Sequence, residues 1–258
     1  MRVVIVLPTY NERENIDAFL RAVRAVPLAE YDELDVLIVD DSSPDGTAEV
    51  ARQTAAELDG APDHTSGSTS VLVRPGKAGL GSAYREGFGR VLGRTDGMAY
   101  DVVISMDADL SHDPAVIPTM FALLAEGADA VVGSRYVRGG GTTDWPVHRQ
   151  LLSKWGNTYT RAVLGLDTRD CTSGFRAYRS EALRAVDPMS TGAEGYAFLT
   201  ELVRRLTRAG YKVVETPIVF RDRTAGRSKM SGRIIAESML LVTRWGLKDV
   251  VRGRRRRG

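Results

Sequence analysis

Two carboxylates separated by one residue, Asp107 and Asp109, follow an apolar run that has the length of a β-strand. In open α/β sheets, ligands bind beyond the carboxyl ends of the strands, where such side chains lie. This pair could hold a hard divalent cation such as Mg²⁺, which keeps several waters and takes phosphate oxygens as further ligands. Asp also favours turns and caps, so capping is the alternative interpretation. The pattern favours a metal site.

A second acidic pair, Asp40 and Asp41, ends another apolar run. A carboxylate in that position of a dinucleotide-binding fold accepts hydrogen bonds from the nucleoside, and we assign this role to Asp41. We assign helix capping, the alternative role, to Asp45. Tyr10 and Glu12 follow the first apolar run, where a ring could stack on a base and a carboxylate could accept from it. Tyrosine is more often a core residue, so only its location supports this interpretation.

Three other chemistries fit the sequence poorly. The segment Gly79-Leu80-Gly81-Ser82-Ala83-Tyr84 begins like a dinucleotide fingerprint, but it has tyrosine in place of the third glycine and follows the third strand. No Walker A motif is present. His64, His112 and His148 are scattered, and Cys171 is the single cysteine, so no nucleophilic triad is evident. These observations disfavour a dehydrogenase, a P-loop enzyme and a hydrolase.

The elements that position these residues alternate between strands and helices. Residues 3–7, 36–39, 71–73, 102–106 and 130–132 are apolar without alternation, which is typical of strands covered on both faces of a parallel sheet. Apolar residues at helical spacing over 16–26 predict a helix, with Asn11 and Glu14 as its capping box. Asp45-Gly46-Thr47 opens a second helix. The first 135 residues therefore predict a βαβ sheet.

The second half of the chain has a different pattern. A glycine-rich connection over 139–143 precedes helical stretches near 149–164 and 196–209 and strands near 175–178 and 212–220. Neither an internal repeat nor an independent second core is evident. We therefore expect one domain.

Composition and charge narrow the class of protein. The 258 residues are 43% hydrophobic and 26% charged, which excludes a disordered, collagen-like or disulfide-scaffold protein. Neither a transmembrane segment nor a signal peptide is evident, and a single cysteine fits a reducing cytosol. Residues 221–258 carry twelve Lys and Arg against three Asp and Glu, whereas the other residues carry 23 against 30. This asymmetry indicates an anionic ligand or surface near the C-terminal end, although the last arginines also suit a solubilising tail.

Six motifs occur in one order and together resemble the polyprenol (dolichol) phosphate mannosyltransferases, which are inverting enzymes with a GT-A fold. The resemblance runs from about residue 3 to residue 245. It implies an α/β, Rossmann-like, nucleotide-sugar-binding GT-A fold with a mixed central sheet, GDP-mannose as donor and polyprenyl (dolichyl) phosphate as acceptor. The motifs are Pro8-Thr-Tyr-Asn-Glu12, Asp40-Asp41-Ser-Ser-Pro-Asp45-Gly-Thr, Lys77-Ala-Gly-Leu-Gly81, Asp107-Ala-Asp109-Leu-Ser-His112, Gly133-Ser-Arg135-Tyr and Phe220-x-x-Arg223-x-x-Gly-x-Ser228-Lys229.

The resemblance also implies a role for individual residues. Arg223 and Lys229 would reach the diphosphate when their loop closes. Ser111 would be a third metal ligand, at a position where the family often has a glutamine. The other matched positions are Pro8, Tyr10, Glu12, Val39, Asp41 and Ala108 for the nucleotide sugar, Asp107 and Asp109 for Mg²⁺ or Mn²⁺, and Arg135, Arg149 and Ser153 for the acceptor phosphate. Residues 1–231 would form the catalytic domain, with a donor and metal half over 1–135 and an acceptor half over 136–231.

The chemistry of these residue types agrees with that assignment. A metal ion and Arg or Lys can neutralise a diphosphate leaving group, so Asp107, Asp109, Arg223 and Lys229 are the expected catalytic residues. An acceptor phosphate that is already ionised needs no histidine base. Glucosyl or other glycosyl transfer to polyprenyl phosphate is the nearest alternative. A processive synthase is disfavoured because Leu241 stands where its Q-x-x-R-W motif has glutamine, and a non-enzymatic module does not explain the ordered motifs.

Residues 232–258 predict an amphipathic helix followed by a basic tail. The helix could lie in the membrane interface, and the tail, Arg254 to Arg257, would be attracted to anionic lipids. The alternative is that its apolar stripe packs on the catalytic core. We expect a cytoplasmic protein that binds peripherally to the cytoplasmic face of the membrane. It could bind a membrane-protein partner, and we do not expect it to bind nucleic acid.

Overall fold

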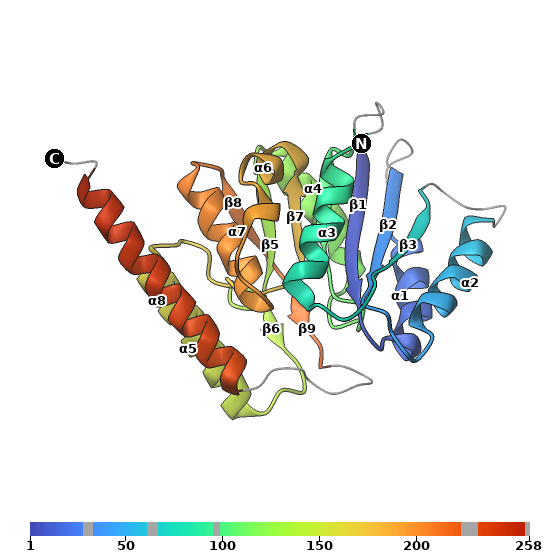
Figure 1. The fold of residues 1–258 in the computed structure, drawn as a ribbon, viewed down its shortest axis with the longest axis horizontal. Helices are drawn as coiled ribbons and strands as arrows, with labels where there is room; N and C mark the ends of the chain where they lie inside the picture. The colour runs from blue at the N-terminus through green and yellow to red at the C-terminus, as the bar shows by residue number, and fades with distance from the viewer. Residues whose placement is uncertain (28–32, 61–66, 95–98, 223–231, 256–258) are drawn as a thin grey trace.

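The computed structural model describes residues 1–27, 33–60, 67–94, 99–222 and 232–255 (Figure 1). In these residues, seven strands form one sheet in the order β3-β2-β1-β4-β7-β5-β8. β7 is antiparallel to both of its neighbours, and the other pairs are parallel. The strands of the sheet are β1 (Arg2–Thr9), β2 (Glu33–Asp40), β3 (Thr69–Val73), β4 (Val102–Ser105), β5 (Ala130–Ser134), β7 (Arg176–Arg179) and β8 (Val213–Pro217). The predicted mixed sheet is confirmed.

Helices cover both faces of the sheet, and a short second pairing lies beside it. The helices are α1 (Arg13–Arg24), α2 (Thr47–Asp59), α3 (Leu80–Leu92), α4 (Ile117–Ala125), α5 (Val147–Leu164), α6 (Ser180–Ala185), α7 (Tyr196–Arg208) and α8 (Gly232–Arg255), with 3₁₀ turns η1 (Pro114–Val116) and η2 (Pro188–Ser190). β6 (Gly141–Thr142) pairs in parallel with β9 (Val219–Phe220). The predicted strand over 212–220 is therefore divided between two sheets.

The apolar strands are explained by burial on both faces. Alternate residues of β1 belong to different clusters, since Ile5 packs in the core on the α1 and α4 side and Val6 packs in the core on the α3 and α7 side. Both side chains are completely buried. If every second residue of β1 were polar, those polar side chains would be buried in one of these two cores. The parallel strands also bring their carboxyl ends to one edge of the sheet.

The capping box predicted at the start of α1 is wrong. Asn11 has a φ of 57°, a left-handed conformation that Asn tolerates better than most residues. The left-handed turn at Asn11 precedes the helix, and Glu12 takes the N-cap position, with no hydrogen bond between its side chain and the backbone N–H groups of the first turn. The Glu12 N–H donates to Thr47 Oγ1 at 2.9 Å, and its carboxylate accepts from Asn15 at 2.9 Å. The turn after β1 is thus tied to the start of α2.

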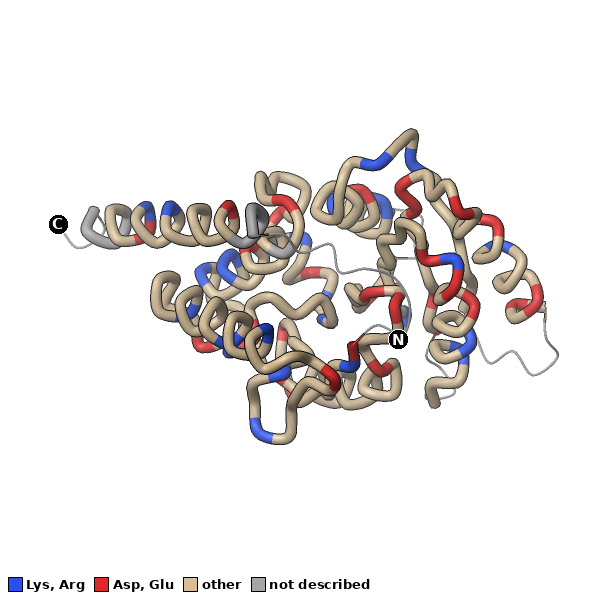
Figure 2. Tube along the Cα trace, turned by 90° about the horizontal axis from the view of Figure 1, so that it is seen from below, with Lys and Arg blue, Asp and Glu red and all other residues tan. Residues whose placement is uncertain are grey.

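α8 packs against α5 and α7 at one end of the molecule, whereas α2 lies at the other end (Figure 2). Val242 is buried against this side of the core, and a Cβ on Gly246 would lie 2.5 Å from a Val163 methyl group, so the two helices meet closely there. Asp249 forms ion pairs with Arg204 and Arg208 of α7. The inner face of α8 therefore packs on protein, while Leu240 and Leu247 point away from it and are exposed. None of the described helices is long and apolar enough to cross a bilayer.

Candidate active site

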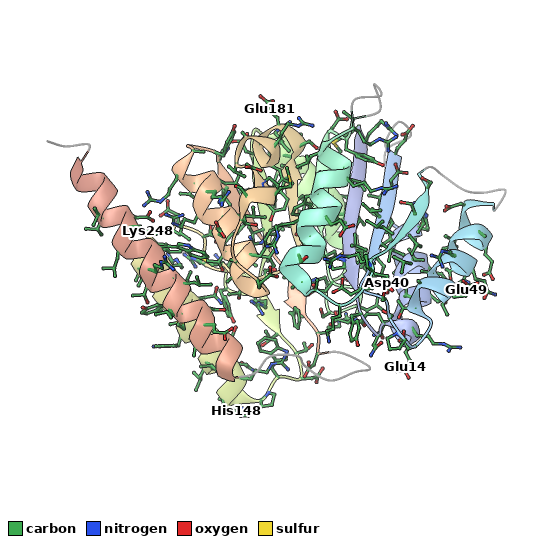
Figure 3. All side chains as sticks on the ribbon, in the orientation of Figure 1. Glu14, Asp40, Glu49, His148, Glu181 and Lys248 are labelled. Carbon is green, nitrogen blue, oxygen red and sulfur yellow. The ribbon has the colours of Figure 1, made fainter. Side chains whose placement is uncertain are left out.

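The candidate residues of the first half gather where β1, β2 and β4 end. Figure 3 shows Asp40 at the lower end of the sheet and His148 at the start of α5 on the same lower side. Parallel pairing sets Thr9 opposite Asp40 and Val6 opposite Ser105, so the segments that follow these strands emerge side by side. The pairing thus places the predicted metal and nucleoside residues at one edge.

The Asp107–Asp109 segment is fixed by contacts from both sides. Asp109 is buried, and its Oδ1 accepts from the Ser111 hydroxyl at 2.6 Å and from the Ser111 N–H at 3.1 Å. Asp107 lies against Gly174, where a Cβ would be 3.1 Å from both carboxylate oxygens. Glycine at 174 thus leaves room for that carboxylate. The Asp107 N–H donates to Nδ1 of buried His112 at 3.4 Å.

This donor set fits a hard cation that keeps part of its hydration. Asp107 and Asp109 provide oxygen ligands, which Mg²⁺ and Mn²⁺ prefer. No group of three His, Cys, Asp or Glu side chains that could hold a metal ion occurs in the described ranges. The Ser111 hydroxyl donates to Asp109, and therefore orients that carboxylate. Its predicted role as a direct ligand stays a prediction.

The predicted nucleoside residues surround the end of β2. Asp41 is buried, and it accepts from Arg74 and from the N–H groups of Ala78 and Gly79, both at 3.1 Å. A carboxylate has about four acceptor positions, so a nucleoside hydroxyl can still bind there. Tyr10 follows β1 and is half-buried.

The remaining nucleotide candidates lie on three different segments. Pro8 is in β1, Glu12 precedes α1, Val39 is buried in β2, and Ala108 is buried beside the metal carboxylates. Gly46, and not Asp45 as predicted, is the N-cap of α2, although Asp45 Oδ1 accepts from the Thr47 N–H at 3.0 Å. Asp45 also accepts from the Arg13 N–H at 3.1 Å, and so joins the starts of α1 and α2.

A cavity of about 150 Å³ connects Asp107 to the groove between α5 and α8. It brings together Asp107, Arg135, Arg149 and Ser153, which the sequence placed in two different halves. The nucleoside candidates do not line it. Its wall is mostly apolar and includes Trp145, Leu152, Ala197, Phe220, Met239 and Val242.

Arg135 is held by a buried carboxylate. Its Nε and Nη2 donate to the two oxygens of Asp170, both at 2.7 Å, and Nη2 also donates to Thr172. Burial alone would raise the pKa of Asp170, but the charge and hydrogen bonds of Arg135 outweigh burial and keep that pKa below its ordinary value. The pair fixes the guanidinium 5.5 Å from the ring centres of Trp145 and Phe220.

Arg149 and Ser153 lie one turn apart on α5. The Arg149 guanidinium carbon is 3.9 Å from the centre of the Trp145 ring, and Nη1 donates to Asp222 at 3.1 Å. The Ser153 hydroxyl accepts from Tyr136 at 2.6 Å. Burial raises the pKa of Tyr136, so this phenol remains a hydrogen-bond donor near neutral pH. Arg135, Arg149 and Ser153 could therefore bind an anion together, with both guanidinium groups near the Trp145 ring.

Four residues of this site were not assigned from the sequence. His112 packs between Phe175 and Phe220, with ring centres 5.4 and 5.3 Å away, and supports Asp107 instead of binding a metal with another histidine. Asp170, Trp145 and Ser173 line or support the cavity, although no motif marked them. The hydroxyl of Ser173 and Nε1 of Trp145 are buried without a hydrogen-bond partner in the part of the chain that the structure describes. An unpaired polar group near a cavity is visible only after folding.

Arg223 and Lys229 lie outside the described residues. The segment that leads to them is placed, because the Arg221 N–H donates to the Ser111 carbonyl oxygen at 3.2 Å. The chain therefore passes the Asp109 side of the site directly before residue 223.

Residues 4–187 match the family model described as glycosyl transferase family 2. The chain belongs to this family. An undecaprenyl-phosphate mannosyltransferase of Micrococcus luteus is 45% identical over 96% of this chain and 95% of its own length. A polyprenol monophosphomannose synthase of Mycolicibacterium smegmatis is 42% identical over 96% of this chain and 88% of its own length. The predicted resemblance to the polyprenol phosphate mannosyltransferases is confirmed.

Solved structures show that this family 2 chain has the GT-A fold. A mannosyltransferase of Pyrobaculum calidifontis, in complex with GDP-Man and Mn²⁺, has a TM-score of 0.62 at 19% identity and covers 97% of this chain and 64% of its own. Glucosyl-3-phosphoglycerate synthase of Mycobacterium tuberculosis, in complex with Mn²⁺, UDP-glucose and phosphoglyceric acid, has a TM-score of 0.62 at 18% identity, covering 94% and 79%. The two enzymes use different donors, so their shared architecture establishes the fold alone.

Proposed function

We propose that this enzyme transfers mannose from GDP-mannose to polyprenyl phosphate and releases polyprenyl phosphate β-mannose and GDP. The names of its relatives, at 45% and 42% identity over nearly the whole chain, support this acceptor and this sugar. The observation that carries the proposal is the cavity, because it places Asp107 beside two arginines. The Asp107 end of the cavity suits a cation bound to a diphosphate, and the end with Arg135 and Arg149 suits a second phosphate.

The donor would bind at the edge formed by β1, β2 and β4. Pro8, Tyr10, Glu12, Val39 and Asp41 would hold the guanosine, with Ala108 near the nucleotide. Asp107 and Asp109, with Ser111 beside them, would hold Mg²⁺ or Mn²⁺, which supplies positive charge to the leaving diphosphate when it is bound.

A second source of positive charge is proposed for the diphosphate. Arg223 and Lys229 would add to it from the segment that follows Phe220 and Arg221. The hydrogen bond between Arg221 and Ser111 supports that location.

The acceptor phosphate would bind to Arg135, Arg149 and Ser153. Planar guanidinium groups can each bind two phosphate oxygens, and their contacts with Trp145 restrict their orientation. A phosphate monoester is largely ionised near pH 7, so no base is required to remove a proton. Its oxygen attacks the anomeric carbon as the bond to the diphosphate breaks, and attack from the opposite face converts α-mannose to β-mannose. The apolar wall limits access of water, which would otherwise hydrolyse the donor.

The assay that tests this proposal offers GDP-mannose and UDP-glucose separately, with a polyprenyl phosphate and Mg²⁺ or Mn²⁺. We expect a lipid-linked mannose, no product after chelation of the metal, and a β-anomeric signal by NMR. Glucose transfer in place of mannose transfer would favour the alternative donor. Release of free mannose without a lipid product would contradict the acceptor.

We also propose that the enzyme binds the membrane surface, because its acceptor has a lipid tail. Exposed apolar side chains on two adjacent helices support this: Val147, Leu151, Leu152 and Trp155 on α5, and Leu240, Leu247, Val250 and Val251 on α8. Because α8 also packs on α5 and α7, only its outer face is available to lipid. A cytoplasmic location and a membrane-protein partner remain predictions.

The basic tail can be tested separately from these helices. Truncation after Val251 keeps the ion pairs to α7 and the exposed valines of α8, and it removes Arg252 and Arg254 to Arg257. We expect weaker co-sedimentation with anionic vesicles at low salt, at roughly 1 kcal/mol per basic residue near the surface. Activity on a short, detergent-soluble acceptor should not change. Equal vesicle binding by the truncated and full-length proteins would contradict an anchoring role for the tail.

A further inference from the structure

Lys77 covers the ring on which the donor base is proposed to stack. Its Nζ lies 3.8 Å from the centre of the Tyr10 ring. An aromatic base stacked on that face would occupy the same space, so the ammonium group must move aside as the base arrives. The flexible four-carbon side chain of lysine allows this movement. Lys77 is exposed, and its side chain is therefore not confined by the core.

The backbone of the Lys77 loop is fixed to the nucleoside site. The N–H groups of Ala78 and Gly79 donate to Asp41 Oδ2, both at 3.1 Å, and Arg74 pairs with Oδ1 of the same carboxylate. Arg74 also donates to the hydroxyl of Ser82, beyond the loop. The loop is thus anchored at both ends, and Lys77 projects from it toward Tyr10. A mobile side chain on a fixed backbone can make a selective contact with a bound base.

We propose that Lys77 reads the donor nucleobase, an inference that rests on the proposed function. When the base stacks on Tyr10, the ammonium moves to its edge and donates to the O6 and N7 acceptors of guanine. Lysine is well suited to this pair of acceptors. Adenine has an amino group in place of O6. This amino group and the ammonium group are both hydrogen-bond donors, so they cannot bond to each other. Uracil has one carbonyl at the matching edge and a smaller ring to stack. Lys77 thus favours GDP over ADP and UDP.

The test compares Lys77→Met with the wild-type enzyme by calorimetric titration of GDP, ADP and UDP in the presence of Mg²⁺. Methionine keeps the apolar length and removes the charge. Lys212→Met is the matched control, since Lys212 is exposed and precedes β8, at the sheet edge opposite β3. Lys77→Arg, which keeps two donors, should retain the preference for GDP.

We expect Lys77→Met to weaken GDP binding about tenfold and ADP binding less than twofold, while Lys212→Met changes neither. An equal loss for all three nucleotides would overturn the proposal, because a contact with phosphate or a structural contact with Tyr10 does not depend on the base. Unchanged binding would also overturn it. If the wild-type enzyme itself does not prefer GDP, the proposed donor is wrong and the Lys77 proposal is wrong with it. If the wild-type enzyme prefers GDP and Lys77→Met keeps that preference unchanged, the donor assignment stands and the Lys77 proposal is wrong.

Discussion

The two ends of the proposed catalytic site hold their charges in different ways. On the metal side of the donor edge, the buried carboxylate of Asp109 accepts hydrogen bonds from the N–H group and the hydroxyl of Ser111. In the acceptor cavity, Arg135 and Arg149 each pair with one carboxylate and lie near the Trp145 ring. Neutral donors leave a carboxylate its charge, and so keep it ready for a cation. An ion pair offsets most of an arginine's charge but fixes its direction.

This difference indicates what each end contributes to the reaction. The donor edge contributes negative charge that needs a metal ion to become useful. The acceptor cavity contributes orientation, because its arginines can bind a phosphate only where their remaining N–H groups point. Variants at the donor edge should therefore lower turnover most. In the cavity, some variants should lower the stability of the protein and others should weaken binding of the acceptor.

Asp107→Asn and Asp109→Asn should have the largest effect on activity. An amide binds Mg²⁺ weakly and cannot neutralise its charge, so we expect kcat to fall by about 10³-fold or more, with little change in the melting temperature. Steady-state assays at saturating donor and metal, with thermal unfolding as the control, would measure both. Near-normal turnover in both variants would contradict the metal site.

Asp170→Asn should have the largest effect on stability. It leaves Arg135 buried without its counter-ion, and we expect the free energy of unfolding to fall by about 3–5 kcal/mol. Because the pKa of Asp170 is lowered in the folded protein, its contribution is present above the ordinary Asp pKa of about 4 and is lost as the pH falls through the folded value. Denaturant unfolding at pH 7 and at low pH should therefore show a difference between wild type and variant that shrinks with acid. A constant difference would contradict the ion-pair explanation.

Arg149→Lys should have a moderate effect that is confined to the acceptor. Lysine keeps the positive charge, but it lacks the planar group that lies 3.9 Å from the Trp145 ring centre and the fork that binds two oxygens. We expect kcat/KM for polyprenyl phosphate to fall about tenfold, while KM for GDP-mannose stays within twofold. Lys154→Arg, on an exposed position of the same helix, is a control for altered charge type. A matching rise in the donor KM would mean that Arg149 belongs to both ends of the site.

Ser173→Ala should have the smallest effect on stability. Its hydroxyl has no hydrogen-bond partner in the described ranges, so its removal should leave the free energy of unfolding unchanged or raise it by up to about 1 kcal/mol. Ser105→Ala is the comparison, because the buried Ser105 hydroxyl donates to the Gly174 carbonyl oxygen at 2.8 Å. That variant should lose about 1 kcal/mol. Chemical denaturation distinguishes the two, and an equal loss would mean that Ser173 is already paired in solution.

The donor edge and the acceptor cavity also differ in how much of each could be predicted from the sequence. The strands of the first half were predictable, because each apolar run depends on residues that are close in the chain, whereas the mixed sheet was implied only by the family resemblance. The spacing of Asp107 and Asp109 is equally local, and their metal role stays a prediction. Asn11 was predicted to be a cap because sequence spacing does not reveal a left-handed φ. The partners of the arginines were not predictable, since Asp170 and Asp222 lie 35 and 73 residues from Arg135 and Arg149. Nor does any sequence pattern distinguish the inner face of α8 from the outer one.

The antiparallel strand β7 has a consequence for the order in which the enzyme can become active during its synthesis. β7 pairs with β4, and it brings Gly174 against Asp107 and under the hydroxyl of Ser105, 69 residues earlier in the chain. A nascent chain that has left the ribosome only as far as residue 135 contains the whole proposed donor and metal half, but it lacks this support behind the carboxylate. Such a fragment should not form a working metal site. The proposed cleavage of the activated sugar would therefore start only after the acceptor half has folded onto the donor half.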